Sequence, residues 1–542
     1  MKQSSAHEAW GTRLGLILAM AGNAVGLGNF LRFPTQATNH GGGSFMITYF
    51  IALLLLGIPL MWIEWGLGRH GGRYRKGHIP GMFASVWRHP AAKYVGVLGL
   101  VIPFVVLTYY TCIESWTLAF TFFSITKDYW GLETQEAMIG YLRSFQSVGD
   151  PSMHGAFMPF VFFLATLSIN IWIVSKGISG GIERLAKIGM PLLFLFALVL
   201  AIVVCTMPAR PDIGATPADG FQFIYRPDLS GLKSPAVWLA SAGQIFFTLS
   251  VGMGTLQTYA SYLRSKDDIL LSGLATSATN ETAEVVLGGS IAIPAAVVFF
   301  GVTGATQIAA SGAFNLGFAT MPVVFQQLPF GHVLAFMWFG LLFFAGITSS
   351  VAMATPMMAF FREEFGLRRE PVAWGLGAAV LLFGLFHIAW LDYGFLDEWD
   401  YWGGTFGLSL FAVAEVIIFM WIFKPENAWH TIHEGADIRL PGVFKFIMTY
   451  ITPAYLFAIF LWWSISDALP ILAMDKTPTG DPYAPEARPY IIIARLVILL
   501  LFAAFLILIR IAWKRNRYDD RAGFTEVEEL ASSSTTSTGL NL

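Results

Sequence analysis

Two apolar segments of the sequence contain breaks that an ordinary lipid-facing helix avoids. The first break holds Gly22, Asn23, Gly26 and Gly28, and the second is the run Ser-Val-Gly-Met-Gly at 250–254. Glycine in a helix interior costs about 1 kcal/mol relative to alanine, so clusters of glycine favour local unwinding. Unwound backbone within a membrane frees carbonyl oxygens for a cation and N–H groups for an anion. Close helix packing through small residues is the alternative explanation.

The rest of the chain is too apolar for a water-soluble fold. Of its 542 residues, 55% are apolar and only 13% are charged, and the mean hydropathy is +0.61. The net charge of −2 argues against a nucleic-acid partner, which would require a concentrated basic face. Cys112 and Cys205 lie within apolar runs and fit no disulfide framework or metal-site spacing. No segment alternates as β-barrel strands do, so the sequence predicts an all-α polytopic membrane protein.

Twelve segments are long and apolar enough to cross a bilayer as helices, which requires roughly 20 residues. The predicted spans are 13–38, 45–68, 91–124, 155–175, 185–207, 235–262, 269–302, 331–361, 372–391, 403–423, 443–467 and 489–513. The two breaks fall in spans 1 and 6. Breaks at matching positions favour two inverted halves, spans 1–5 and 6–10, with a transport site between them.

Basic residues indicate how these spans are oriented. Lysine and arginine crowd the loops on the N-terminal side, as at Arg69, Arg73, Arg75 and Lys76, and are sparse on the other side. The positive-inside rule therefore places both termini in the cytoplasm. The predicted organisation is a cytoplasmic N-terminal segment at 1–9, a first repeat at 10–207, a second repeat at 235–423, two further helices within 443–513 and a disordered cytoplasmic tail at 514–542 without a role in transport.

Several separate stretches resemble the neurotransmitter:sodium symporter family. Residues 13–16, Arg-Leu-Gly-Leu, and 26–34, Gly-Leu-Gly-Asn-Phe-Leu-Arg-Phe-Pro, resemble the first-helix signature of that family. Residues 244–250 and 345–350 extend the resemblance, which is greatest to bacterial members of the LeuT type and runs from Trp10 past span 12. It implies a LeuT-type 5+5 inverted repeat with unwound helices 1 and 6. It also implies sodium-coupled amino-acid symport across a bacterial plasma membrane.

The resemblance further implies two Na⁺ sites. The first would comprise the Ala24 carbonyl, Asn29, Thr248, Asn280 and the substrate carboxylate. The second would comprise the carbonyls of Gly22, Val25 and Ala345 and the hydroxyls of Thr348 and Ser349. Sodium is a hard cation that prefers oxygen ligands, and both protein sets supply neutral oxygens. For Thr348 alone, a hydrogen bond back to its own helix is an equally good explanation.

The implied substrate pocket combines polar backbone with apolar side chains. Its predicted members are Asn23, Ala24, Leu27, Gly28, Val106, Tyr110, Phe247, Thr248, Ser250, Met253, Ser349 and Met353. Monoamine-carrying relatives place an aspartate at the position of Gly26, so glycine there indicates a substrate that brings its own carboxylate. Met253 and Met353 replace the usual phenylalanine and isoleucine, and flexible methionines predict tolerance of several hydrophobic L-amino acids.

The resemblance also assigns gates and an internal carboxylate. Arg32 and Asp400, with Gln244 nearby, would close the outer gate over Tyr110 and Phe247. Asp400 is expected just before span 10. His7 and Glu363 take the positions of the inner gate, and their pairing would weaken as histidine deprotonates near pH 6.5.

Glu284 stands where chloride-dependent relatives have serine, so transport without chloride is expected. Tyr49, Gln244 and Thr248 would complete the site of this chloride-substituting carboxylate. Proton counter-movement from Glu284 is left open.

Three other acids within spans, Glu64, Glu114 and Glu415, are interpreted as structural carboxyls that fix helix packing. An amino-acid-binding receptor or a channel without coupled transport is the alternative function. Paired breaks and gate charges favour a transporter over a pore with repeated polar rings. The sequence shows no P-loop, HExxH or Ser/His/Asp pattern, so no enzyme is expected. Membrane lipid is an expected partner, and a homodimer is left open.

Overall fold

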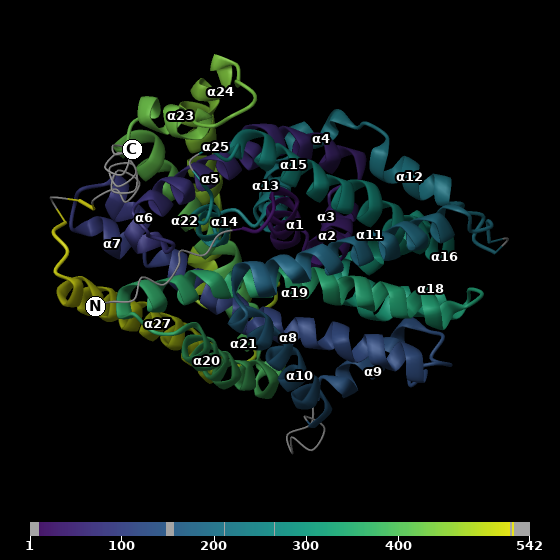
Figure 1. The fold of residues 1–542 in the computed structure, drawn as a ribbon. Coiled ribbons are helices and arrows are strands. Elements are labelled where there is room, and N and C mark those ends of the chain that lie inside the picture. The colour runs from purple at the N-terminus through teal and green to yellow at the C-terminus, as the bar shows by residue number, and fades with distance from the viewer. Residues whose placement is uncertain (1–9, 148–156, 211, 265, 521–522, 525–542) are drawn as a thin grey trace, which may run out of the picture.

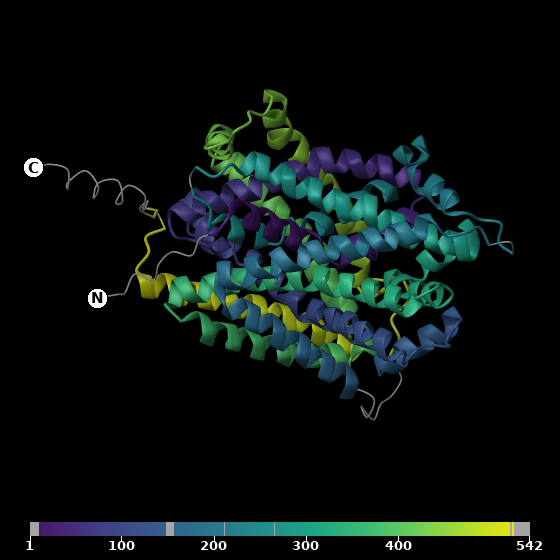
Figure 2. The same ribbon diagram turned by 45° about the vertical axis from the view of Figure 1, so that its right-hand side comes forward.

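The computed structural model describes residues 10–147, 157–210, 212–264, 266–520 and 523–524. Within these ranges all regular secondary structure is helical, as predicted. Figures 1 and 2 show long helices running side by side through the molecule, with shorter helices at their ends. The all-α fold class follows directly from the apolar composition, because a helix satisfies its backbone groups internally.

Ten described helices are long and apolar enough to cross a membrane. They occupy Gly43–Arg73 (α4 to α5), Ala91–Thr126 (α7 to α8), Phe157–Ser175 (α10), Ile178–Cys205 (including α11), Ile269–Ala310 (α15 to α16), Gly331–Phe365 (α19), Arg369–Ala389 (α20), Phe395–Ile422 (including α21 and α22), Gly442–Leu472 (α24 to α26) and Arg488–Asn516 (α27). These ten match predicted spans 2–5 and 7–12. Shorter helices between the long ones in sequence are α6 (Ile79–Val86), α9 (Gln135–Phe145), α12 (Pro217–Tyr225), α17 (Ala313–Asn315), α18 (Met321–Gln326) and α23 (Pro425–His433).

The other two predicted spans are divided into shorter helices. Span 1 comprises α1 (Arg13–Ala24), α2 (Leu27–Phe30) and α3 (Arg32–Asn39), and span 6 comprises α13 (Pro235–Leu249) and α14 (Thr255–Ala260). Both interruptions lie at the glycine clusters. The total of twelve crossings remains a prediction, because neither divided segment is by itself long enough to count among the ten.

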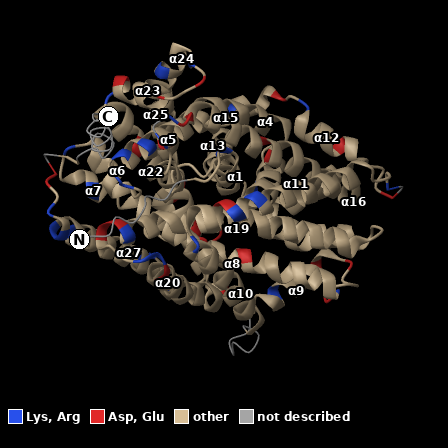
Figure 3. Ribbon diagram, in the orientation of Figure 1, with Lys and Arg blue, Asp and Glu red and all other residues tan. Residues whose placement is uncertain are grey.

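The bundle keeps its charged side chains mostly at helix ends and in connecting loops. Figure 3 shows long helical stretches without Lys, Arg, Asp or Glu, with a few charged residues at the centre. One position differs from the sequence expectation. Asp400 lies inside the helical segment Phe395–Ile422 rather than just before span 10, because the segment begins eight residues earlier than predicted.

The predicted disordered tail at 514–542 begins too early. α27 continues to Asn516, whose side-chain amide donates to the Glu364 carboxylate (2.8 Å) and to its backbone carbonyl (3.0 Å). Tyr518 and Phe524 lie against Lys76, whose Nζ is 4.0 and 4.6 Å from their ring centroids. Residues 525–542 lie outside the described ranges.

Lys76 connects this C-terminal segment to the loop after α5 (Ile58–Arg73). Its ammonium donates to Glu364 Oε1 (2.6 Å) and to the Tyr518 hydroxyl (2.7 Å). Burial opposes the charged form, but the Glu364 carboxylate and Tyr518 more than offset this and raise the pKa of Lys76 above its ordinary value. The buried ammonium is therefore charged at neutral pH, and it depends on both partners.

Replacing Tyr518 with alanine should lower the free energy of unfolding by about 1–2 kcal/mol, since Lys76 would lose a cation–π contact and a hydrogen bond. Thermal unfolding of the full chain in detergent measures this effect. Lys514→Ala is the matched control, because Lys514 is exposed in the last turn of α27, four residues before Tyr518. Equal midpoints for the two variants would show that the contact contributes nothing to stability.

Candidate functional site

Span 1 is interrupted between α1 and α2 by two non-helical residues. Val25 has φ −74° and ψ 94°, and Gly26 is extended at φ −115° and ψ −168°. The Gly26 N–H donates to Asn29 Oδ1 (2.8 Å), and the Leu27 N–H donates to the Tyr110 hydroxyl (3.1 Å). Side chains thus satisfy backbone groups that the break releases, which keeps this irregular segment stable inside the bundle.

Span 6 is interrupted between α13 and α14 by the Ser-Val-Gly-Met-Gly run at 250–254. Ser250, Gly252 and Gly254 have positive φ angles of 52°, 75° and 82°. Glycine adopts this region without strain, which explains its presence at two of these positions. The Ser250 hydroxyl donates to the Asn23 carbonyl (2.7 Å), so the breaks of spans 1 and 6 are in direct contact.

The polar residues assigned to the first sodium site lie together. Asn29 Nδ2 donates to Thr248 Oγ1 (3.1 Å) and to Asn280 Oδ1 (2.9 Å), and Asn280 Nδ2 donates to Thr248 Oγ1 (2.7 Å). All three side chains are buried. Ala24, the fourth predicted member, lines the adjacent cavity. The arrangement brings the side-chain oxygens of Thr248 and Asn280 together, which suits a hard monovalent cation, while Asn29 presents its amide N–H groups to them and its oxygen to the Gly26 N–H.

Glu284 borders this cluster and receives hydrogen bonds from three amide groups. Its Oε1 accepts from Gln244 Nε2 (2.6 Å), and its Oε2 accepts from Asn29 Nδ2 (3.1 Å) and Asn280 Nδ2 (3.5 Å). The carboxyl group is fully buried. Gln244 therefore contacts Glu284 as predicted, while Thr248 reaches it only through the asparagines.

Sequence reasoning missed Glu281. The Tyr49 hydroxyl donates to Glu281 Oε2 (3.0 Å) and also interacts with Glu284, whose site we expected it to complete. Asn280 Nδ2 also approaches Glu281 Oε1 at 3.4 Å. A second acid one helical turn before Glu284 on the same span was the available signal.

The residues assigned to the second sodium site also converge. The Ser349 hydroxyl lies 3.3 Å from the Gly22 carbonyl oxygen and 3.2 Å from that of Ala345. Thr348 Oγ1 donates to the Phe344 carbonyl (2.9 Å) and also approaches the Ala345 carbonyl (3.2 Å). Thr348 therefore bonds to its own helix, as the alternative explanation expected, while lying beside the other oxygens.

Close approach of α1 and α19 (Gly331–Phe365) makes this convergence possible. A Cβ atom at Gly22 would lie 3.1 Å from Thr348 Cβ, so a larger residue would separate the two helices. Val25, the remaining predicted member, follows α1 at the start of the break. The glycines of span 1 thus serve both helix packing and unwinding.

A cavity of about 730 Å³ lies where the two breaks meet. All predicted pocket residues except Asn23 and Thr248 line it, namely Ala24, Leu27, Gly28, Val106, Tyr110, Phe247, Ser250, Met253, Ser349 and Met353. The Asn23 side chain instead donates to Thr255 Oγ1 (3.1 Å), and Thr248 turns toward Asn29. The cavity extends to residues 309–314, at the end of α16 and the start of α17, and to Thr479 and Asp481, between α26 and α27.

The predicted outer-gate residues line this cavity without pairing directly. Arg32 donates to the Gly243 carbonyl (3.0 Å) and to Gln244 Oε1 (3.4 Å), and its guanidinium carbon lies 3.9 Å from the Phe247 ring centroid. Arg32 and Asp400, both described residues, border the cavity without an ion pair within 4 Å, and Asp400 instead forms a hydrogen bond with Tyr109. The expected pair therefore lies on one cavity but is not joined by an ion pair.

Residues 10–12 pack over the N-terminal end of α1, which lies away from the cavity. The Trp10 indole N–H donates to the Tyr259 carbonyl (3.1 Å), and their rings meet edge to face at 5.3 Å. The Gly11 N–H and the Thr12 hydroxyl both donate to the Glu183 carboxylate (2.8 and 2.9 Å). These contacts fix the segment against α11 (Glu183–Cys205) and α14.

Glu363, assigned to the inner gate, receives two contacts from the Gly77 N–H at 2.8 and 3.1 Å. His78 Nε2 lies 3.7 Å from Glu363 Oε2 and 2.8 Å from Glu364 Oε1. Burial lowers the pKa of His78 below its ordinary value, although Glu364 opposes this shift. His7, the expected partner of Glu363, lies outside the described residues, so their pairing remains a prediction.

Comparison with known proteins gives consistent matches along the chain. A profile of the sodium:neurotransmitter symporter family matches residues 7–138 and 141–472. An uncharacterized sodium-dependent transporter of Methanocaldococcus jannaschii is 28% identical over 506 residues, covering 93% of this chain and 97% of that protein. The uncharacterized sodium-dependent transporter YhdH of Bacillus subtilis is 30% identical over 415 residues, covering 76% and 84%.

A vertebrate relative and a solved structure extend the comparison. The human sodium- and chloride-dependent GABA transporter 2 is 25% identical over 503 residues, covering 84% of this chain and 79% of that protein. The crystal structure of MhsT in complex with L-phenylalanine matches with a TM-score of 0.72 and 29% identity, covering 84% of this chain and 99% of MhsT. Sequence signatures, fold and matched helix breaks agree, and this chain belongs to the sodium:neurotransmitter symporter family, whose members are sodium-coupled membrane transporters and not enzymes.

Proposed function

We propose that the protein imports hydrophobic L-amino acids together with sodium by alternating access, without a requirement for chloride. The observation that carries this proposal is the cavity at the junction of the two helix breaks, flanked by the two groups of residues that we assign to sodium. MhsT, which has a similar fold, was solved with L-phenylalanine. We place the protein in a bacterial plasma membrane with both termini in the cytoplasm, as the distribution of Lys and Arg indicates.

The cavity has the polarity that an amino acid requires. Tyr110 and Ser250 present hydroxyl groups near the helix breaks, whereas Val106, Met253 and Met353 present apolar surface. A zwitterionic head group would lie against the polar part, and the side chain of the substrate would bury against the apolar part. Sodium at the cluster of Asn29, Thr248 and Asn280 would face the substrate carboxylate.

Opening on one side supports alternating access. The cavity reaches the non-cytoplasmic loops, while Trp10 and its neighbours close the cytoplasmic end. The structure thus has the arrangement expected for an outward-facing state. Inward release would require the contacts of Trp10 and Glu363 to open.

Uptake of labelled amino acids into proteoliposomes tests the proposal. Leucine, methionine, phenylalanine and tryptophan should each accumulate when external sodium exceeds internal sodium, and accumulation should stop when a sodium ionophore removes the gradient. Accumulation that is independent of sodium would overturn the coupling. Sodium-dependent binding without accumulation would instead favour the receptor alternative, and downhill flux alone would favour a channel.

Replacing Met253 with phenylalanine should narrow the substrate range. Met253 lines the cavity, and a rigid ring there would leave less room for aromatic side chains than a flexible thioether does. We expect uptake of phenylalanine and tryptophan to fall by about tenfold relative to leucine. Competition between labelled leucine and each unlabelled amino acid measures this change, and an unaltered order of competition would contradict it.

A further inference from the structure

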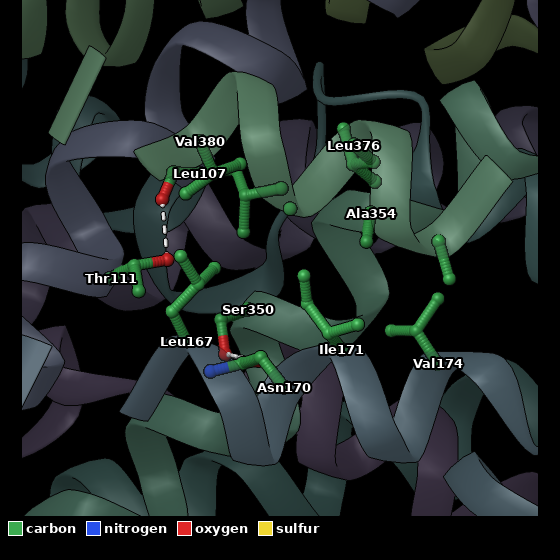
Figure 4. Close-up of a pocket in the computed structure, with 12 residues that line it drawn as sticks. Leu107, Thr111, Leu167, Asn170, Ile171, Val174, Ser350, Ala354, Leu376 and Val380 are labelled. Atoms are coloured by element: carbon green, nitrogen blue, oxygen red, sulfur yellow. Dashed lines mark hydrogen bonds between the residues drawn. The ribbon is translucent and has the colours of Figure 1, made fainter. Parts of the chain in front are cut away.

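The helix bundle contains two features that the proposed function does not use. One is an apolar crevice between α8 (Leu98–Thr126), α10, α19 and α20, where Figure 4 shows Asn170 facing Ser350. The Ser350 hydroxyl donates to Asn170 Oδ1 (2.7 Å), so these two polar side chains satisfy each other. The other feature is a buried ion pair between Glu398 and Arg495. Unlike the crevice, this ion pair adjoins a predicted gate residue.

Glu398 and Arg495 are joined by two parallel hydrogen bonds. Arg495 Nε donates to Glu398 Oε2 (2.8 Å), and Arg495 Nη2 donates to Glu398 Oε1 (3.1 Å). The Glu398 side chain is fully buried, and that of Arg495 is nearly so. Arg495, on α27, also donates to the carbonyls of Ile471 (2.6 Å) and Leu472 (3.0 Å) at the end of span 11. The planar guanidinium suits this site, because its donors have a fixed geometry that matches a carboxylate.

Two aromatic side chains complete this cluster. The Tyr483 hydroxyl donates to Glu398 Oε1 and accepts from Arg495 Nη2 (2.9 Å). The Trp402 indole N–H donates to Glu398 Oε2 (2.8 Å), and its ring centroid lies 5.9 Å from the guanidinium carbon. We refer to the four residues Glu398, Trp402, Tyr483 and Arg495 as the Arg495 clamp. The clamp joins spans 10, 11 and 12 with the loop at 473–487.

The Arg495 clamp holds the chain on both sides of Asp400. This residue lies midway between Glu398 and Trp402, two positions from each. Residues four apart share one face of a helix, whereas a residue midway between them points to nearly the opposite side. Accordingly, Glu398 and Trp402 meet the clamp, while Asp400 borders the substrate cavity and forms a hydrogen bond with Tyr109.

The loop at 473–487 is fixed by the same clamp and also borders the cavity. Thr479 and Asp481 line the cavity, and Tyr483 binds Glu398 two residues later in the chain. Residues on two sides of the clamp, in span 10 and in this loop, therefore form part of the cavity wall. Arg495 itself is not one of the residues that line the cavity.

We propose that Arg495 is a positioning residue for substrate binding, which acts by fixing Asp400 at the cavity through the Arg495 clamp. This inference rests on the proposed function. Span 12 lies outside the two predicted repeats, so the clamp gives it a part in transport without contact with the substrate. Loss of the clamp leaves the cavity lining chemically unchanged but releases Asp400 from its place, which weakens the hold on the substrate.

Binding and uptake of labelled leucine by the full-length protein test this inference. Lysine at position 495 keeps the positive charge but lacks the planar fork, so it cannot reproduce both bonds to Glu398. We expect Arg495→Lys to weaken leucine binding by about tenfold, with less than about a twofold change in the maximal rate of uptake. Binding of radioactive sodium without substrate should stay unchanged. A merely structural role predicts a lower thermal midpoint with wild-type leucine affinity in the folded protein.

A second substitution shows whether the clamp acts through Asp400. In an Asp400→Ala background, Arg495→Lys should have no further effect on leucine binding, because the positioned group is already absent. Lys476→Gln is the matched control. Lys476 lies in the same loop and forms an ion pair with Asp467 (2.7 Å) outside the clamp, so its loss should leave leucine binding as in the wild type.

Tyr483→Phe decides if Arg495→Lys fails to fold. This variant removes a single hydroxyl group that binds both Glu398 and Arg495. We expect leucine binding to weaken by about threefold, again without a change in sodium binding. Wild-type leucine affinity in Tyr483→Phe would then overturn the positioning role.

The outcomes separate this inference from the function on which it rests. Wild-type leucine affinity in folded Arg495→Lys would overturn the positioning role alone. An equal loss of leucine affinity with and without Asp400 would also overturn it, because the clamp would then act elsewhere. Absence of sodium-dependent leucine binding in the wild type would overturn the proposed function and this inference together.

Discussion

Replacing Gly26 with aspartate is expected to lower sodium-driven amino-acid uptake by at least about a hundredfold, because it introduces both a steric conflict and a charge into the substrate cavity. A Cβ atom at Gly26 would lie 3.0 Å from the Tyr110 hydroxyl oxygen and 3.1 Å from Ser349 Oγ. Neither neighbour can withdraw freely, since Tyr110 accepts from the Leu27 N–H and Ser349 lies beside the Gly22 carbonyl.

The charge adds to the steric effect. The polar part of the cavity is where we place the carboxylate of the substrate, and a second carboxylate there would repel it in a poorly solvated site. Gly26→Ala separates the two contributions, because alanine adds only the Cβ atom. We expect a smaller loss for alanine, with substrate affinity reduced by about tenfold.

Uptake in proteoliposomes and binding of labelled leucine measure both variants. Gly140→Asp is the matched control, because Gly140 lies exposed on α9 and an added Cβ would meet nothing within 4 Å. Wild-type uptake by Gly26→Asp would show that the substrate carboxylate lies elsewhere. Uptake of the decarboxylated amine in place of the amino acid would support the assigned position.

The two helix breaks were predictable because glycine carries a local conformational signal. Gly252 and Gly254 adopt positive φ angles that other residues rarely adopt. The neighbouring Gly26 is extended with negative φ, and its requirement comes from the close approach of Tyr110 and Ser349. A sequence shows that a helix is interrupted, but the three-dimensional contacts show why a given glycine is needed.

The direction of side chains at the breaks could not be derived from spacing. Asn23 and Thr248 belong to the segments that form the cavity, yet their side chains point to Thr255 and Asn29. Once the backbone leaves the helical path, the periodicity of 3.6 residues no longer fixes which face a residue presents. The resemblance identified the correct segments, and the hydrogen bonds then distribute individual residues between cavity and ion cluster.

Pairs of charged residues were also less predictable than the helices. Arg32 and Asp400 line the same cavity, but Arg32 lies over Phe247 and binds Gly243 and Gln244. A gate has two states, and a sequence pattern does not specify which one the fold adopts. The ordered start of the C-terminal segment was missed for another reason: its contacts with Lys76 join residues more than 400 positions apart in sequence.

Replacing Glu284 with serine is expected to make transport depend on chloride. In the wild type, amide groups of Gln244, Asn29 and Asn280 donate to the Glu284 carboxylate. Serine would remove the carboxylate and leave the buried Gln244 amide without its acceptor, which costs about 1–3 kcal/mol, while Asn29 and Asn280 keep Thr248 as an acceptor. A chloride ion could occupy the space, accept the hydrogen bonds and restore the negative charge beside the proposed sodium site.

We therefore expect uptake by Glu284→Ser to fall by at least about tenfold when gluconate replaces chloride, while wild-type uptake stays unchanged. Glu284→Gln is the matched control, because glutamine fills the space but supplies no charge. It should transport poorly in either anion. Loss of wild-type uptake in gluconate would refute chloride independence, and anion-independent uptake by Glu284→Ser would show that the carboxylate is not needed for charge balance at the sodium site.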